Sequence, residues 1–409
     1  MDYPGIVKTF FWLAATYLYA HLVGGRLASF IFYISVIVIA VSVLWFKILA
    51  GIEVTCVADR KVSQVGQPVR LKISIRNKTI LPVPWLRCWV EQPTTVKSEE
   101  RYQCYHLSLR PRECCDFSVE IPCLIRGEFR LGNITLQSGD LFGVFEDQRV
   151  YTEELELLVL PEITLLNNKG YGETVHMAGD HTVNLKSSIR GTGLFGVRNY
   201  YSGDAMNRIH WKASARNRKL LVKEFEQQRS REMVIILDLN RDSCFGPEPE
   251  TTLEKAVSIA ASIAGTGLKE GNQVGLVALG EERVYLRPQT GRGHLGMVLE
   301  RLARVKADAT DCFADTAYRE STGFPKGARM VLVTARITPE LVERLYQMAA
   351  RGYHCTLILL KAETFEAGAG DEFQRTRLLS QLQGKVPVFL VSRQTDLRVN
   401  LGGVEYGAG

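Results

Sequence analysis

A basic segment in the middle of the chain holds the side chains that are best suited to chemistry. Residues 186–231 contain eleven Lys or Arg and three Asp or Glu, a net charge of +8, whereas the whole 409-residue chain carries +6. Arg208, Lys212 and Arg216 recur every four residues, so on a helix they would share one face. Such a face attracts phosphates, anionic lipid headgroups or an acidic protein surface. A solvated helix face beside a membrane is the alternative.

The neighbours of these cations favour an ordered network of ion pairs over a solvated face. Gly203 and Asp204 offer a turn followed by a helix N-cap, and Asp204 can pair with Arg208 one turn later. Trp211 lies among the charges. His210 could act as a general base, but no Ser or Cys nucleophile with a second carboxylate stands beside it in the sequence. We therefore predict no catalytic residue here.

The segments after this basic region predict a doubly wound α/β domain in residues 233–409. Nearly continuous apolar runs alternate there with amphipathic helical segments, which is typical of a parallel sheet covered by helices on both faces. The predicted strands are residues 233–239, 274–279, 329–333, 355–360 and 386–391, and the predicted helices are residues 253–268 and 339–351.

The segments before it predict a β-sandwich in residues 51–165. Apolar and polar residues alternate without a fault in residues 69–76, as in a half-buried strand. Pro82 and Pro84 exclude a helix in residues 81–86. Further alternating runs are residues 117–121, 128–131, 134–136 and 155–160, and short strands at this spacing indicate a sandwich of about 110 residues. Residues 166–232 would then form a linker region that contains the basic motif.

The N-terminal 50 residues predict two membrane-spanning helices, residues 9–25 and 27–46. Neither stretch contains a charged residue, and a bilayer needs about 20 apolar helical residues, with about 17 as the lower limit. A signal peptide is the alternative, but an Ala-x-Ala cleavage site is missing. Only Arg26 lies in the turn, whereas Lys8, Lys47, Arg60 and Lys61 flank the outer ends. The positive-inside bias therefore places both soluble domains in the cytoplasm.

The cysteines agree with a reducing compartment. The chain has nine of them, an odd number, with no C-x-x-C pair. Cys114 and Cys115 are adjacent and cannot easily bridge each other. This is neither a disulfide framework nor a zinc signature, so we interpret each cysteine as a small buried hydrophobe or a surface thiol.

The basic segment also resembles a known family. A G-x-G sequence beginning at Gly191 is followed by R-x-Y-x-x-G-D-x-x-x-R-I-H-W-K-A-S-A-R, and this run is similar to the hallmark of domain of unknown function family 58. Upstream residues 82–86, Arg126-Gly127 with Gly132, and residues 138–143 resemble the β-domain of the same family. Asn199 departs from the pattern, which often has an acidic residue there. The motif residues are Arg198, Tyr200, Gly203, Asp204, Arg208, His210, Trp211, Lys212, Ser214 and Arg216.

The resemblance implies a fold and a partner. Proteins of this family look like membrane-anchored partners of MoxR-type AAA+ ATPases, with a C-terminal domain similar to the von Willebrand factor A fold. That fold can hold Mg²⁺ through D-x-S-x-S after its first strand, and here Asp238, Asn240 and Asp242 occupy the pattern. Arg336 falls about where a later loop would supply a carboxylate, and a cation opposes metal binding. We therefore expect no cofactor, with Mg²⁺ as the second interpretation.

Three functions follow from these features. The first is a non-enzymatic adaptor, in which the motif joins the β-domain to the α/β sheet, so that substituting Arg208 or Trp211 would unfold the protein. The second is a hydrolase or phosphotransfer enzyme that uses Asp204 and His210, although the sequence contains no P-loop, H-E-x-x-H or G-x-S-x-G motif. The third, nucleic-acid binding, is disfavoured because aromatic residues are not interleaved with the charges.

Overall fold

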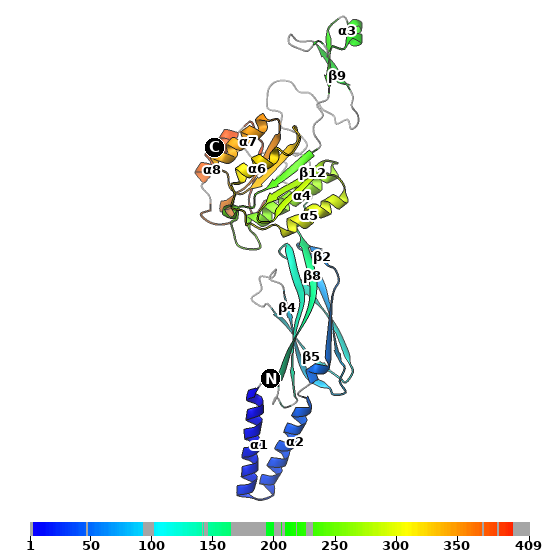
Figure 1. Ribbon diagram of the computed structural model, residues 1–409, viewed down its shortest axis with the longest axis vertical. Helices are drawn as coiled ribbons and strands as arrows, with labels where there is room; N and C mark the ends of the chain where they lie inside the picture. The colour runs from blue at the N-terminus through cyan, green and yellow to red at the C-terminus, as the bar shows by residue number, and fades with distance from the viewer. Residues whose placement is uncertain are drawn as a thin grey trace.

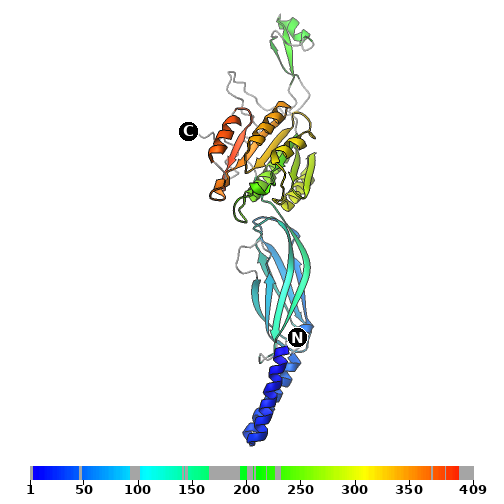
Figure 2. The same ribbon diagram turned by 60° about the vertical axis from the view of Figure 1, so that its left-hand side comes forward.

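The protein is elongated, with its parts arranged in a row. The computed structural model describes residues 3–45, 48–92, 102–140, 142, 146–164, 194–199, 206, 209–217, 219–225, 232–369, 372–382 and 384–395. Figures 1 and 2 show the two N-terminal helices, a β-sandwich and an α/β domain following one another along the long axis.

The first two helices pack side by side as a hairpin. Helix α1 (Tyr3–Val23) and helix α2 (Arg26–Trp45) are joined at Gly24 and Gly25, whose φ angles of 67° and 90° suit glycine. Among the described residues, only the helix segment Arg26–Val43 is long and apolar enough to cross a membrane, and Thr9–Val23 is a shorter apolar helix. A second span in residues 9–25 therefore stays a prediction.

The β-sandwich consists of two sheets with one shared apolar core. Alternate residues of β3 (Val69–Asn77) are buried, as the sequence pattern of residues 69–76 predicts. Residues 128–131 and 134–136, predicted as two strands, form one strand with a bulge at Gly132, whose φ is 100°. One sheet contains β1 (Ile52–Ala58), β3 (Val69–Asn77) and β6 (Cys114–Ile121); the other contains β2 (Val62–Gln64), β8 (Glu146–Leu160), β7 (Gly127–Gly139), β4 (Val83–Glu91) and β5 (Tyr102–Leu109).

The α/β domain is doubly wound around one six-stranded sheet. The strand order is β13-β12-β11-β14-β15-β16, and all neighbours are parallel except β13, an antiparallel edge strand that the sequence pattern did not predict. The strands are β11 (Glu232–Leu237), β12 (Gln273–Leu279), β13 (Arg283–Gln289), β14 (Arg329–Thr334), β15 (His354–Leu360) and β16 (Val388–Val391).

Helices cover both faces of this sheet. Odd-numbered residues of β11 pack with α4 (Thr252–Lys269) and α5 (Arg292–Arg304) in one apolar cluster. Even-numbered residues pack in a second cluster on the other face, which contains α6 (Phe313–Ser321), α7 (Pro339–Ala350) and α8 (Glu372–Leu382). Burial on both faces explains why the strands are nearly continuous apolar runs.

A small hairpin unit follows the β-sandwich in sequence. It contains β9 (Leu194–Asn199), α3 (Trp211–Asn217) and β10 (Leu221–Phe225), with β9 and β10 antiparallel. In Figures 1 and 2 this unit lies beyond the α/β domain, at the end of the molecule away from α1 and α2.

Candidate functional site

The boundary between the β-sandwich and the α/β domain is built around Arg126. This residue directly precedes β7, and its side chain is only 3% exposed. Its Nε donates to the carbonyl oxygen of Leu302 at 2.9 Å, and its Nη2 donates to that of Val305 at 2.8 Å. Both carbonyls belong to the C-terminal end of α5, where helix carbonyls lack partners within the helix and favour a cation.

Glu254 completes the environment of this guanidinium. It lies in the first turn of α4 and forms an ion pair with Nη1 of Arg126. Thr251, the N-cap of α4, accepts a hydrogen bond from the backbone N–H of Glu254. A buried guanidinium is stable only when its charge and its N–H donors are matched, and all three described contacts of Arg126 cross the domain boundary.

Further contacts extend this boundary on both sides of Arg126. Arg304, at the end of α5, pairs with Glu128 of β7 at 2.6 Å. The backbone N–H of Thr164 donates to the hydroxyl of Ser262 on α4 at 2.9 Å. Because these contacts involve β7, the segment after β8, α4 and α5, the two domains meet over a surface rather than at one point.

A second junction connects the β-sandwich to α2. The hydroxyl of Ser42 donates to Oδ2 of Asp140 at 2.5 Å, and both residues are buried. The backbone oxygen of Asp140 accepts a hydrogen bond from the indole of Trp85 at 3.3 Å, and the hydroxyl of Ser138 donates to the oxygen of Trp85. Trp85, Ser138 and Asp140 all come from the upstream segments of the family resemblance.

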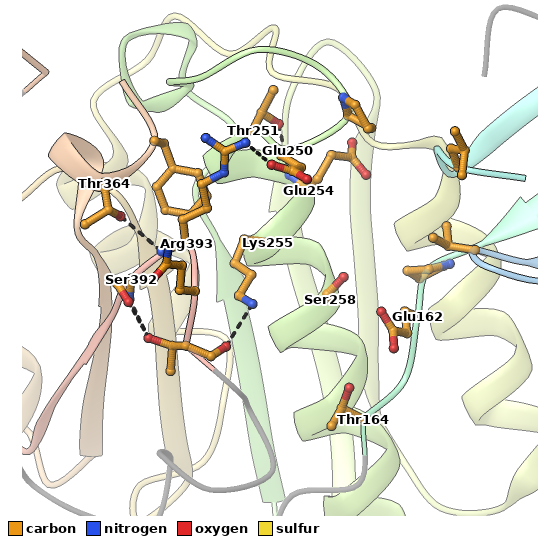
Figure 3. A pocket seen from close by; sticks show the side chains of 17 residues that line it. Glu162, Thr164, Glu250, Thr251, Glu254, Lys255, Ser258, Thr364, Ser392 and Arg393 are labelled. Atoms are coloured by element: carbon orange, nitrogen blue, oxygen red, sulfur yellow. Dashed lines mark hydrogen bonds and ion pairs between the residues drawn. The ribbon is translucent and has the colours of Figure 1, made fainter. Parts of the chain in front are cut away.

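A cavity of about 980 Å³ opens beside the Arg126 junction (Figure 3). Residues from both domains line it, including Thr164 and the first turns of α4. Glu250 pairs with Arg393, and Lys255 donates to the backbone oxygen of Thr395 at 3.0 Å. Charged side chains of both signs therefore line the cavity wall, and two of them form an ion pair.

Asp238 lies at the carboxyl end of β11, where the chain connections diverge to the two sides of the sheet. Open α/β sheets bind ligands at this position. The carboxylate accepts hydrogen bonds from the backbone N–H of Asn240 at 2.9 Å and from the hydroxyl of Thr334 at 2.6 Å. Burial raises the pKa of the Asp238 carboxyl, and the hydrogen bond from Thr334 opposes this shift.

The other two metal candidates lie on the loop that follows Asp238. Asn240 accepts from the N–H of Asp242 at 2.8 Å and donates to the backbone oxygen of Asp311 at 3.1 Å. Asp242 is exposed and forms an ion pair with Arg336 at 3.3 Å. The described part of the chain holds no group of three His, Cys, Asp or Glu side chains placed to bind a metal ion. Binding of Mg²⁺ by the side-chain oxygens of Asp238, Asn240 and Asp242 stays a prediction.

The described residues of the basic motif hold α3 against β10. His210 is half-buried. Its backbone N–H donates to the backbone oxygen of Leu221 at 2.7 Å, and its backbone oxygen accepts a hydrogen bond from the backbone N–H of Ser214. The hydroxyl of Ser214 accepts from the N–H of Leu221 at 2.8 Å, and Ser214 is buried. Ile209 forms an isolated bridge with Val222. Ser214 therefore has a structural role within the hairpin unit.

Comparison with known proteins agrees with the family resemblance of this region. A family model described as "Protein of unknown function DUF58" matches residues 196–363. The match is to DUF58. It includes every motif residue from Arg198 to Arg216 and most of the α/β domain. The uncharacterized protein YeaD of Bacillus subtilis (strain 168) is 27% identical over 401 residues, covering 95% of this chain and 93% of YeaD.

The following two solved structures resemble this chain only weakly. The CARDB domain of the PF1109 protein from Pyrococcus furiosus is 16% identical and covers 26% of this chain and 91% of its own, with a TM-score of 0.21. The sporulation control protein Spo0M from Bacillus subtilis is 12% identical and covers 27% of this chain and 49% of its own, with a TM-score of 0.16. Scores this low support no inference about function.

Arg126 and Arg304 join the β-sandwich to the α/β domain, and neither belongs to the motif. The joining role of the motif therefore stays a prediction. Trp211 is 65% exposed, and the need for its side chain in folding also stays a prediction. Arg216 is exposed on α3, which also contains Lys212, and Arg198 lies in β9. Tyr200, Gly203, Asp204 and Arg208 lie outside the described residues.

Sequence reasoning missed the roles of Arg126 and Asp140. Both residues belong to segments that resemble the family, and neither segment carries a local pattern that predicts its role. Arg126 binds backbone carbonyls that lie 176 and 179 residues away, and such acceptors leave no mark on the sequence. The one available signal was an isolated Arg before a strand.

Proposed function

We propose that this protein is a membrane-anchored, non-enzymatic adaptor that holds its α/β domain at a fixed place above the membrane for a protein partner. The observation that carries the proposal is the buried Arg126 junction. A guanidinium bound to α5 carbonyls and to Glu254 restrains rotation between the two domains. A rigid spacer of this kind suits presentation of a surface better than capture of a substrate between moving domains.

The anchor in this proposal is a hairpin of two spanning helices, with both chain ends and both soluble domains in the cytoplasm. The charge distribution around α1 and α2 supports this orientation. Tyr17 packs edge-on against Phe32, with ring centroids 5.6 Å apart, which supports a paired hairpin. The contact between Ser42 and Asp140 would place the base of the β-sandwich directly at the membrane surface.

The partner in this proposal is a MoxR-type AAA+ ATPase, and the α/β domain is of the von Willebrand factor A type. The sheet order and the position of Asp238 after its first strand support the fold assignment. The family resemblance supports the partner. In this proposal Asp238 holds its loop against the end of β14, because its carboxylate accepts hydrogen bonds from Asn240 and Thr334.

Affinity purification of the full chain from its native membranes tests the proposal. We expect an AAA+ ATPase to co-purify and its rate of ATP hydrolysis to change when the purified chain is added. Recovery of no ATPase would contradict the proposed partner, and recovery of no protein at all would contradict the adaptor function. Hydrolysis of phosphoesters or peptides by the purified chain, abolished in His210→Ala, would instead favour the enzyme alternative.

A further inference from the structure

We infer that the exposed side chains of the hairpin unit, Met206, Trp211, Arg216, Lys219 and Leu220, form a docking surface for a protein that presents an apolar pocket rimmed by acidic side chains. We call it the Trp211 face. The inference rests on the proposed adaptor function and deepens it, because it names the surface and the chemistry of the partner.

Three large apolar side chains of this face are exposed within fifteen residues of sequence. Met206 is 72% exposed, Trp211 is 65% exposed and Leu220 is 47% exposed. Exposed apolar residues that gather on one small unit are typical of interaction sites. Tryptophan is also among the residues that most often dominate binding energy when they enter a pocket.

Basic side chains accompany these apolar groups. Arg216 and Lys219 are exposed, and neither forms an ion pair with another residue that the structure describes. Residues 186–231 carry +8, whereas the rest of the chain carries 6 − 8 = −2. Complementary charge speeds association and rejects partners of the same sign, so the favoured rim is acidic.

The hairpin unit buries too few of its described residues to be stable without contacts from another surface. Its described buried residues are Ile209, Ser214, Leu221 and Val222. Isolated two-stranded hairpins are marginally stable in water, and a seven-residue helix adds little. A partner that covers the Trp211 face would supply the missing apolar contacts.

The position of the hairpin unit excludes the membrane that anchors the chain. The β-sandwich docks at the carboxyl edge of the sheet, through Glu254 at the start of α4 and Val305 after α5. Glu232 begins β11 at the opposite, amino edge, and the hairpin unit ends only seven residues earlier, at Phe225. Figures 1 and 2 show this unit at the far end from α1 and α2. The hairpin unit therefore cannot reach anionic lipid around α1 and α2, and we assign its basic charge to binding a protein.

Photo-crosslinking in native membranes tests this inference. The full chain carries the substitution Trp211→p-benzoylphenylalanine, which keeps an aromatic side chain on the face. We expect ultraviolet light to produce an adduct with a protein whose crosslinked peptide is rich in Asp and Glu. The charge reversals Arg216→Glu and Lys219→Glu together should reduce this adduct about tenfold or more. The matched control Lys326→Glu, an exposed lysine on the α/β domain, should leave it unchanged.

A salt wash gives a second measurement that does not require the charge-reversed variant to fold. At about 1 M salt the screening length is about 3 Å, so the adduct of the unreversed chain should fall by a similar factor. An adduct with lipid alone, an adduct with a second copy of this chain, or no adduct would overturn the inference. An adduct that persists after both charge reversal and salt would overturn it as well.

The inference and the adaptor function fail in different ways. If an ATPase co-purifies with the chain but the probe at position 211 does not label it, only the assignment of the Trp211 face is wrong. If no protein partner co-purifies at all, the adaptor function itself is wrong.

Discussion

Arg126 and Glu254 form an ion pair across the boundary of the two soluble domains, although 128 residues separate them in sequence. Arg126 comes from the loop before β7, and Glu254 comes from the first turn of α4. The same guanidinium also binds the carbonyls at the end of α5. One side chain therefore connects two helices of the α/β domain to the β-sandwich.

Replacing Arg126 should separate the unfolding of the two domains. Arg126→Ala leaves two helix carbonyls and Glu254 without their donor, and we expect a loss of about 2–4 kcal/mol in the free energy of unfolding. Differential scanning calorimetry of the purified full chain should then show two transitions, whereas we expect one for the natural chain.

Arg304→Ala is the matched control for this substitution. Arg304 also crosses the boundary, but its partner Glu128 is largely exposed, so solvent screens the pair. We expect a loss below about 1 kcal/mol and an unchanged number of transitions. If the two variants behave alike, Arg126 does not have the role that we assign to it.

Thiol labelling should report both burial and membrane orientation. Burial raises the pKa of Cys56, Cys88 and Cys355 to about 12, so only about one thiol in 10⁴ is ionised at about pH 8. We expect these three to resist maleimide until the protein unfolds. Cys104 and Cys312 are exposed and should react in the folded protein.

A membrane-impermeant maleimide applied to whole cells turns the same chemistry into a test of orientation. With the soluble domains in the cytoplasm, Cys104 and Cys312 should be labelled only after the cells are permeabilised. Labelling in intact cells would place these domains outside and would refute a cytoplasmic adaptor.

Asp238→Asn should stabilise the protein by an amount that grows with pH. Because burial raises the pKa of Asp238 in the folded state, the folded protein binds its proton more tightly than the unfolded chain does. Stability from this group is therefore present below the unfolded pKa, about 3.9, and is lost as pH rises through the folded pKa. An asparagine at position 238 does not ionise, so the variant does not lose this stability as pH rises. Its side-chain oxygen can still accept a hydrogen bond from the N–H of Asn240.

Thermal unfolding of both proteins at about pH 5 and about pH 7.5 measures this effect. The midpoint of Asp238→Asn should exceed that of the natural chain by more at the higher pH. Millimolar Mg²⁺ should shift neither midpoint. A stabilisation by Mg²⁺ that disappears in Asp238→Asn would instead establish a metal site at Asp238, Asn240 and Asp242.

Ser214 and Trp211 should differ in their effect on the hairpin unit. In Ser214→Ala the backbone N–H of Leu221 loses its acceptor, at a local cost of about 1–2 kcal/mol. Hydrogen exchange of the peptide that contains Leu221 should accelerate by about tenfold. Trp211→Ala removes an exposed side chain and should leave this exchange rate unchanged. Acceleration in this variant would establish a structural role for Trp211.

Local patterns in the sequence predicted most of the elements. The alternation in residues 69–76 appears as β3, because one face of a half-buried strand must be apolar. The apolar runs of residues 233–239 and 355–360 correspond to β11 and β15, which are buried on both faces. The antiparallel edge strand β13 was missed because its outer positions are exposed and carry no strong apolar pattern.

The sequence by itself determined the two apolar N-terminal segments, the sandwich and α/β patterns, and the motif that matches DUF58, because each depends on residues close together in the chain. The tertiary structure alone decided which side chains join the domains. Arg126 meets helix carbonyls and Asp140 meets Ser42 only after folding brings distant segments together. It also decided that Ser214 is buried and Trp211 is exposed, although they lie three residues apart on one helix. Burial depends on which other segments pack against each side chain, and the local sequence does not reveal this.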